Sequence, residues 1–346
     1  MIRNYLSNRT LSVRIGKNFS TKKNVPSGVP QGSVGGPILF NAYIADIVKF
    51  CKTDGVTIKL YADDLKAYHI RSTPDNLNSP LQSFIDKLIN YCSLNGLAIS
   101  EEKCRVMYLG NKNPNSPYYI LGKAINCIEK DHFIRDLGLH FSPDLKWTNH
   151  IEIVTKKARR ISFAIIKSVK TQNIKIFVNL FNVYVRPILE FATNIYNPFL
   201  LKDINKIEKV QKDFLRVIYK KCNPKLFVGN PFSPTPTYKE LLHMSDLESL
   251  EHRRIKSDLI LFHKYLHGEV KINCHRPFES RKTNTRGEKY KMFPLTCKTI
   301  IRHNSYFIRT SRVYTLLPID IRQTNVKLFK LRLSNFCFDK FLKCKL

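Results

Sequence analysis

A pair of aspartates flanked by two short alternating segments constrains the fold of this chain more than any other feature. Residues 57–60 precede Tyr61-Ala62-Asp63-Asp64 and residues 65–70 follow it, and apolar side chains recur with a period of two in both segments. This period is typical of β-strands with one buried face. The sequence therefore predicts a β-hairpin whose tip carries Asp63 and Asp64.

Adjacent carboxylates on a tight turn repel each other, which disfavours folding. The same arrangement suits Mg²⁺, a hard cation that takes oxygen ligands and usually uses one or two protein carboxylates together with substrate phosphates. An aspartate pair in a turn is also common in ordinary solvated loops. On its own, this motif is compatible with either interpretation.

A glycine-rich segment, Gly28-Val29-Pro30-Gln31-Gly32-Ser33, lies upstream of the expected hairpin. Its glycines allow a ligand to approach the backbone closely, and its proline stiffens the loop. We expect Ser33 to cap a helix over residues 37–50, and a helix start after such a loop favours phosphate groups. An ordinary Gly/Pro loop before a helix is the alternative.

Taken in order and spacing, these motifs resemble the reverse transcriptase domain of non-LTR (LINE-type) retrotransposons. The glycine segment with Gly36, Pro37 and Phe40 resembles the template-grip motif of that family, and Tyr61–Asp64 resembles its catalytic hairpin. Three further segments match in the expected order: residues 5–10 before the glycine loop, 94–104 as the next palm motif, and 137–147 as the hairpin that grips the primer. The resemblance covers residues 1 to about 225.

The resemblance implies an α+β fold, with a partial right-hand polymerase palm followed by a helical thumb-like region and a basic C-terminal unit. We expect a palm with its primer-grip hairpin over residues 1–145, a helical thumb-like region over 146–225, and a linker with a basic region over 226–346. The partners implied are an RNA template, a DNA primer and deoxynucleoside triphosphates.

The family's chemistry is nucleotidyl transfer assisted by two Mg²⁺ ions held by carboxylates. By resemblance, Asp63 is a metal ligand and Asp64 a supporting carboxylate, while Tyr61 and Ala62 lie under the primer end. Gln31 and Gly32 are implied to contact the template–nucleotide pair. Lys103 matches a family lysine near the departing pyrophosphate, where it would supply charge or a proton; a solvated lysine is the equal alternative.

One departure from the family concerns its first catalytic aspartate, which lies upstream in a segment of the form Phe-x-Asp-x-x-x-Ala-Phe-Asp. No such segment occurs before Tyr5, and Asp136 lies in the primer-grip motif, in the wrong order. We therefore expect an N-terminally truncated polymerase that is inactive alone. The alternative is a non-catalytic RNA- or DNA-binding remnant of a decayed element.

Composition agrees with a nucleic-acid partner. Lysine and arginine number 58 against 27 acidic residues, a formal net charge of +31, which attracts polyanions. The hydrophobic content of 43% is too high for a disordered basic tail. No apolar stretch approaches the roughly 20 residues of a membrane span, and no signal peptide is evident. Nine scattered cysteines without Cys-x-x-Cys spacing indicate reduced thiols and an intracellular protein, in nucleus and cytoplasm by family resemblance.

Helical periodicity marks several further segments. It predicts a helix over 81–94, a helical region over 149–221, a buried helix over 177–188 and another helix near 238–266, with a proline-rich linker at 224–236 and a basic segment at 281–291. In the first part of the 149–221 region, an apolar stripe runs from Ile151 to Ile165. We expect Lys156, Lys157, Arg159 and Arg160 to face away from that stripe and contact nucleic-acid backbone; an ordinary solvated face is the alternative.

Overall fold

The computed structural model describes residues 2–71, 79–110, 113–129, 132–224, 236–273, 278–282 and 290–343. Its contacts divide the chain into two compact units, residues 1–128 and 129–346. Both units contain helices and short strands, as the expected mixed class requires. The boundaries expected near residues 145 and 225 stay predictions, and most of the expected linker and of the basic segment at 281–291 lies outside the described residues.

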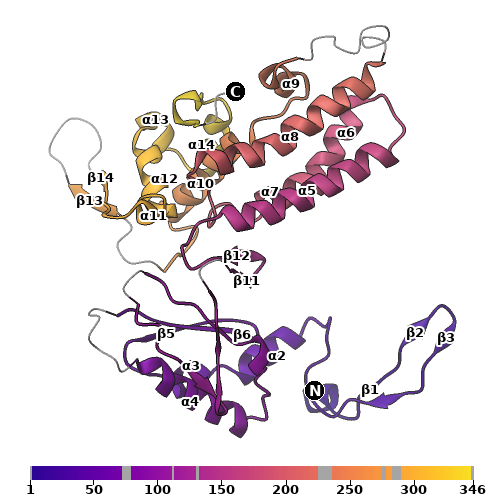
Figure 1. Ribbon diagram of the computed structural model, residues 1–346, viewed down its shortest axis with the longest axis vertical. Helices are drawn as coiled ribbons and strands as arrows, with labels where there is room; N and C mark the ends of the chain where they lie inside the picture. The colour runs from indigo at the N-terminus through magenta and orange to yellow at the C-terminus, as the bar shows by residue number, and fades with distance from the viewer. Residues whose placement is uncertain are drawn as a thin grey trace. The chain divides into compact units, whose positions relative to one another are not determined.

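The first unit begins with a helix and an extended antiparallel arm (Figure 1). Helix α1 spans Ile2–Leu6. The arm is built from β1 (Thr10–Leu11), β2 (Arg14–Ile15), β3 (Asn18–Phe19) and β4 (Lys23–Asn24), with β1 paired to β4 and β2 to β3. Every strand residue of the arm is exposed, so the arm lies outside the core of this unit.

The core of the first unit forms where a β-hairpin packs against helices. Strands β5 (Val56–Tyr61) and β6 (Asp64–His69) pair in an antiparallel register, and both contact α4 (Pro80–Leu94). The predicted hairpin and the helix predicted over 81–94 are thus confirmed. The buried residues of this core are Ile47, Cys51, Phe84, Tyr91 and Cys92.

The single helix expected over 37–50 is wrong, because the chain forms two helices there, α2 (Gly36–Tyr43) and α3 (Ile47–Phe50). At the break Asp46 accepts a hydrogen bond from the Tyr91 hydroxyl on α4 at 2.5 Å, and such a tertiary contact overrides helix propensity. Gly35, not Ser33, is the N-cap of α2.

Short elements complete the first unit. They are the 3-10 helix η1 (Glu101–Lys103), β7 (Arg105–Val106), β8 (Tyr119–Ile120), β9 (Lys123–Ala124) and β10 (Asn126–Cys127). Strand β10 runs parallel to β7, and β8 pairs with β9.

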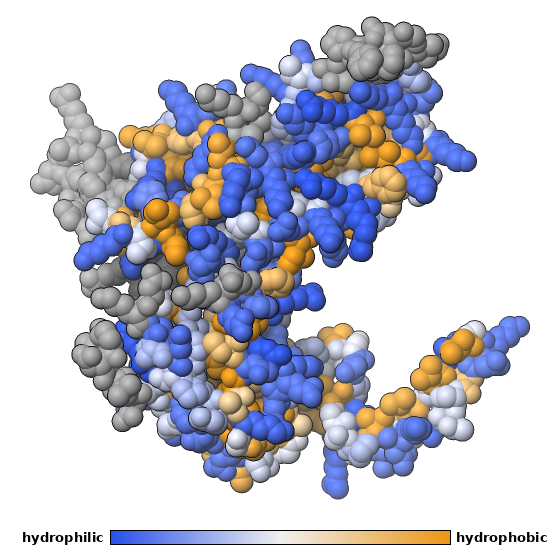
Figure 2. Space-filling view, viewed as in Figure 1, coloured by the Kyte–Doolittle hydropathy of each residue, from blue (hydrophilic) through white to orange (hydrophobic). Residues whose placement is uncertain are grey.

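The second unit is largely helical. Its first part consists of the hairpin β11 (Ile134–Asp136) and β12 (Leu139–Phe141), then α5 (Thr148–Ser168), α6 (Ile174–Leu180), a π-helical turn (Phe181–Val185), α7 (Arg186–Glu190), α8 (Leu201–Cys222) and α9 (Tyr238–Met244). The long helices α5 and α8 lie side by side (Figure 1), and they bury the predicted stripe that begins at Ile151 together with Ile207 of α8. In Figure 2 hydrophilic residues cover most of the visible face of these helices.

The rest of the second unit packs around helix α10. This part contains α10 (Leu250–Leu266), β13 (Phe278–Lys282), β14 (Tyr290–Pro294), α11 (Ile300–His303), α12 (Tyr306–Thr315), α13 (Ile319–Arg322), α14 (Val326–Ser334) and a 3-10 helix (Asp339–Phe341). Leu259, Phe262 and Phe329 are fully buried in its core. Among the described helices, none is long and apolar enough to cross a bilayer.

Two helical expectations in this unit are wrong. The segment 177–188 is not buried all round, since Val183 and Tyr184 are 62% and 57% exposed. The regular helix is interrupted here by a π-helical turn, because the following Pro187 has no N–H for a regular helical hydrogen bond. The helix expected over 238–266 is two helices, α9 and α10. Helix α10 starts after Ser249, whose hydroxyl caps it by accepting from the His252 N–H.

Candidate active site

The predicted aspartate pair lies at the tip of the β5–β6 hairpin. Tyr61 pairs with Asp64, so Ala62 and Asp63 form the turn. Ala62 has a φ of 51°, in the left-handed region, where a residue other than glycine costs about 1–2 kcal/mol. The side chains of Asp63 and Asp64 are both exposed, and neither carboxylate forms an ion pair or hydrogen bond with a described residue.

The hairpin presents two different faces because its side chains alternate. Val56, Ile58 and Leu60 on β5, with Leu65 and Ala67 on β6, pack against the core of the first unit. Tyr61 and Asp64 therefore belong to the opposite face, where Tyr61 is 66% exposed. Six register pairs and one buried face hold the tip in place.

A second candidate element is the glycine loop before α2. Gly28 and Gly32 each have a φ of +79°, which only glycine adopts readily, and Gln31 and Gly32 are exposed. A Cβ on Gly36 would lie 2.8 Å from the Pro30 carbonyl oxygen. The Ser33 hydroxyl donates to that same oxygen at 2.7 Å and accepts from the Gly36 N–H at 3.0 Å. The loop is thus folded tightly onto the start of α2.

Arg9 has a supporting role in this loop that the sequence reasoning missed. Its guanidinium donates to the carbonyl oxygens of Ser27 at 3.1 Å and Gly28 at 2.6 Å, and its Nε donates to Leu6 at 3.0 Å. The sequence signal that could have indicated this role is the position of Arg9 in residues 5–10, the segment that resembles the family's motif before the glycine loop. A cation that bonds three carbonyl groups fixes the approach to the glycine loop.

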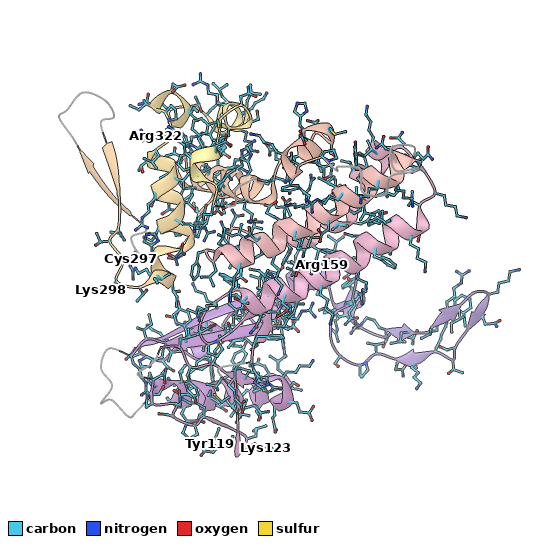
Figure 3. All side chains as sticks on the ribbon, turned by 45° about the horizontal axis from the view of Figure 1, so that its top comes forward. Tyr119, Lys123, Arg159, Cys297, Lys298 and Arg322 are labelled. Carbon is cyan, nitrogen blue, oxygen red and sulfur yellow. The ribbon has the colours of Figure 1, made fainter. Side chains whose placement is uncertain are left out.

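Lys103, the third predicted element, lies at the end of η1. Its side chain is exposed and forms no ion pair with a described residue. Its neighbour Glu101 is instead paired with Lys123 at 2.8 Å; Figure 3 labels Lys123. The structure therefore places Lys103 in solvent on the same unit as the aspartate pair.

The aspartate pair can supply only part of a metal site. Carboxylate oxygens are suitable ligands for Mg²⁺, and both side chains are free to turn toward an ion. Within the described part of the chain, however, no group of three or more His, Cys, Asp or Glu residues is placed to hold a metal. The two carboxylates fit an ion that takes its remaining ligands from water and phosphates.

The four basic residues predicted to contact nucleic acid lie on α5 in the second unit. All four, Lys156, Lys157, Arg159 and Arg160, are exposed and have no ion-pair partner among the described residues. Successive helical residues are rotated by about 100°, so Lys156 and Arg160 share the face opposite the buried stripe, while Lys157 and Arg159 lie on its two flanks. Figure 3 labels Arg159 on this helix. All four residues thus lie outside the buried stripe, as expected, but they are spread over more than one face of the helix.

The hairpin β11–β12, which was predicted to grip the primer, is attached to α5. Its turn consists of Leu137 and Gly138, both with positive φ, and a Cβ on Gly138 would lie 3.0 Å from the ring of Phe191. The Nδ1 atoms of His140 and His150 lie 3.2 Å apart. Burial and the nearby Arg135 lower the pKa of His140, and burial and His140 lower the pKa of His150 to about 4. Both rings are thus neutral at pH 7. The Nδ1–H of one ring can therefore donate a hydrogen bond to the Nδ1 of the other.

Comparison with known proteins identifies relatives of this chain. Residues 1–174, half of the chain, match the family model described as reverse transcriptase (RNA-dependent DNA polymerase). An uncharacterized protein of Caenorhabditis elegans is 29% identical over 161 residues, covering 46% of this chain and 75% of that protein. The RNA-directed DNA polymerases from mobile element jockey of Drosophila melanogaster and Drosophila funebris are 26% and 25% identical, each over 63% of this chain.

The jockey alignments cover only 24% of each polymerase, so the chain spans about a quarter of the length of these relatives. No solved structure is a significant match.

Proposed function

The chain belongs to the reverse transcriptase family of non-LTR retrotransposons, and we propose that its β5–β6 tip is the metal-binding part of an RNA-directed DNA polymerase site. The observation that carries this proposal is the state of Asp63 and Asp64. In a chain with 58 basic residues, both carboxylates are exposed and without a described ion-pair partner. Charges kept available in this way favour a cationic ligand.

The residues around the tip have roles that follow from their placement. Asp63 and Asp64 would hold Mg²⁺, which when bound supplies positive charge to the phosphates and lowers the pKa of a primer hydroxyl. Tyr61 offers an exposed ring beside the carboxylates, on which the terminal base or sugar of the primer can rest. The rigid hairpin would fix the distance between that primer end and the carboxylates.

The glycine loop is the proposed contact for the template–nucleotide pair. Gly28 and Gly32 leave the backbone uncovered, and the exposed Gln31 carries one amide donor group and one acceptor. Lys103 is the proposed counter-charge for the departing pyrophosphate. These two assignments rest on the family's motif order, which the chain preserves.

We also propose that these 346 residues alone do not synthesise DNA. Two metal ions about 3.5–4 Å apart need carboxylates on more than one side. Asp63 and Asp64 come from one turn, and no third ligand joins them among the described residues. The substrates remain those of the family: an RNA template, a DNA primer and deoxynucleoside triphosphates.

A reconstitution assay tests both parts of the proposal. DNA synthesis on an RNA template with Mg²⁺ is measured for this chain and for a version extended with the segment that precedes the matched region in a jockey polymerase. We expect synthesis only from the extended chain, and its loss in Asp63→Ala but not in the control Asp54→Ala, another exposed aspartate of the same unit.

Each remaining outcome has a definite meaning. Synthesis by the unextended chain refutes the proposed inactivity. An extended chain that is active and unaffected by Asp63→Ala refutes the metal-site assignment. A silent extended chain that still binds RNA–DNA hybrid supports the non-catalytic remnant instead.

A further inference from the structure

A groove along one face of helix α10, in the second unit, has no part in the proposed polymerase site. Helix α10 packs against α8, α12 and α14 (Figure 1). The groove has a volume of about 390 Å³, which lies in the usual range for sites that bind small ligands. Besides residues of α10, it is lined by Asn194 from the segment after α7 and by Glu248 from the segment before α10.

The residues of α10 that line the groove belong to one face of the helix. Successive helical residues are rotated by about 100°, so side chains that lie three, four, seven, eight and eleven positions after a given residue share less than half a turn with it. The opposite face is buried in the core and includes Leu259 and Phe262. The groove face of α10 consists of Arg253, Lys256, Ser257, Ile260, Leu261 and Lys264.

The first cation of this face shares its carboxylate with another cation. Glu190 accepts hydrogen bonds from Arg253 at 2.5 and 3.0 Å, and it also lies 3.6 Å from Nε of Arg186. Burial and the nearby Arg253 lower the pKa of Arg186, as expected when two guanidinium groups share one carboxylate. One positive charge at this end of the groove is therefore not balanced by Glu190.

The last cation of the groove face has no such partner. Lys256, in the middle of the face, is paired with Glu248. Lys264, eight positions farther along α10, forms no ion pair or hydrogen bond with a described residue. Because α10 rises by about 1.5 Å per residue, the eleven positions from Arg253 to Lys264 span about 16 Å. The groove thus carries an unbalanced positive charge toward each end.

These features indicate the chemistry of the ligand. Two separated positive charges fit a chain with phosphates in a row, whereas a single phosphate cannot reach both. The half-buried Ile260 and Leu261 lie between the two charges and offer an apolar surface for a base. The carboxylate of Glu248 is an acceptor in the groove, and the 2′-hydroxyl is a donor that RNA has and DNA lacks.

We propose that this groove on α10 binds a short stretch of single-stranded RNA. Arg253 and Lys264 contact backbone phosphates, while Ile260 and Leu261 contact a base. Glu248 accepts a hydrogen bond from a 2′-hydroxyl. The site lies beyond residue 174, where the match to the family model ends, and it does not depend on the proposed function of the β5–β6 tip.

Binding of a single-stranded RNA oligonucleotide to the full chain tests this proposal. Leu261→Trp fills the groove without a change of charge, so the affinity should fall about tenfold, equivalent to the loss of one base contact. Ser257→Phe fills the groove from a neighbouring position and should have the same effect. The matched control is Leu331→Trp at an exposed position of α14, which should leave the affinity unchanged. Thermal unfolding of each variant shows whether its fold is intact.

Two further measurements locate the contact. Lys264→Gln should lower the slope of log affinity against log salt by about 0.7, the value for one phosphate of a single strand, whereas Lys327→Gln on α14 should leave the slope unchanged. Photo-cross-links from RNA that contains thiouridine should map to residues 250–266 and should be lost in Leu261→Trp.

A DNA strand of the same sequence and adenosine monophosphate distinguish the possible ligands. We expect the DNA strand to bind more weakly than the RNA and the monophosphate not to displace the RNA. Equal binding of the two strands overturns the assignment to RNA, and displacement by the monophosphate shows that the groove holds free nucleotides instead. Unchanged RNA affinity in both filling variants, with cross-links outside α10, overturns the site itself. None of these measurements requires DNA synthesis, so their outcome is independent of the proposed polymerase function.

Discussion

The stability of the second unit should fall in mildly acidic solution because of His263 on α10. Its imidazole is fully buried and stacks on Phe329 with ring centroids 3.8 Å apart. Nε2 lies 2.8 Å from the Thr324 carbonyl oxygen and Nδ1 lies 2.9 Å from the Tyr314 hydroxyl. Burial, reinforced by the neighbouring His267, lowers the pKa of His263 to about 4.

The direction of the pH effect follows from proton binding. The pKa of His263 is about 4 in the folded chain and about 6.5 in the unfolded chain, so the unfolded chain binds more protons between these values. Stability is therefore fully present above pH 6.5 and is lost as the pH falls toward 4. With 1.36 kcal/mol for each pKa unit, the loss between pH 7 and pH 5 is about 2 kcal/mol.

Hydrogen exchange of the α10 and α14 amides at pH 7 and pH 5 measures this loss, with rates corrected for intrinsic exchange. The variant His263→Gln removes the titration while keeping a donor for Thr324, so the natural chain should lose about 2 kcal/mol more than the variant. Buried carboxylates such as Asp258 titrate in both proteins and cancel in the difference. Equal losses in the two proteins would refute the argument that burial keeps this histidine neutral.

Two further substitutions test other parts of the structure. Gly36→Ala should destabilise the first unit by about 1–3 kcal/mol, because its Cβ would lie 2.8 Å from the Pro30 carbonyl oxygen. Gly35→Ala is the control, since its Cβ would meet only the Tyr5 hydroxyl at 4.0 Å. Thermal unfolding compares the stability of the two variants. Replacing the four α5 residues Lys156, Lys157, Arg159 and Arg160 with glutamine should lower the salt slope of hybrid binding by about 1 for each phosphate that these side chains neutralise. The control variant, Lys327→Gln with Lys330→Gln on α14, should leave the slope unchanged. Equal slopes in the two variants would show that the basic residues of α5 are only solvated.

The elements that the sequence predicts correctly are those with a complete local period. The alternation around residues 57–70 and the apolar stripe of α5 are found in the structure because one face of each element is buried. Two of the errors lie where a distant side chain contributes to the boundary of a helix. Asp46 bonds Tyr91 on α4, and Glu208 on α8 accepts the Glu251 N–H at the start of α10. Neither contact leaves a periodic signal.

The candidate site divides in the same way. Tyr61, Ala62, Asp63 and Asp64 come together because they are consecutive, so a local motif was sufficient to place them. The role of Arg9 was missed because it depends on bonds to Ser27 and Gly28, eighteen and nineteen residues away. The spread of the basic residues around α5 followed from helix rotation and could have been derived from their spacing alone.

The residues at the tip of the β5–β6 hairpin are unfavourable for folding, which indicates that they serve ligand binding. A left-handed Ala62 costs about 1–2 kcal/mol, and glycine there would remove that cost. The carboxylates of the adjacent Asp63 and Asp64 also repel each other. These unfavourable terms are tolerated because the other face is buried against α4. A cation bound at the tip would relieve the repulsion between the two carboxylates, which is why we assign this tip to metal binding.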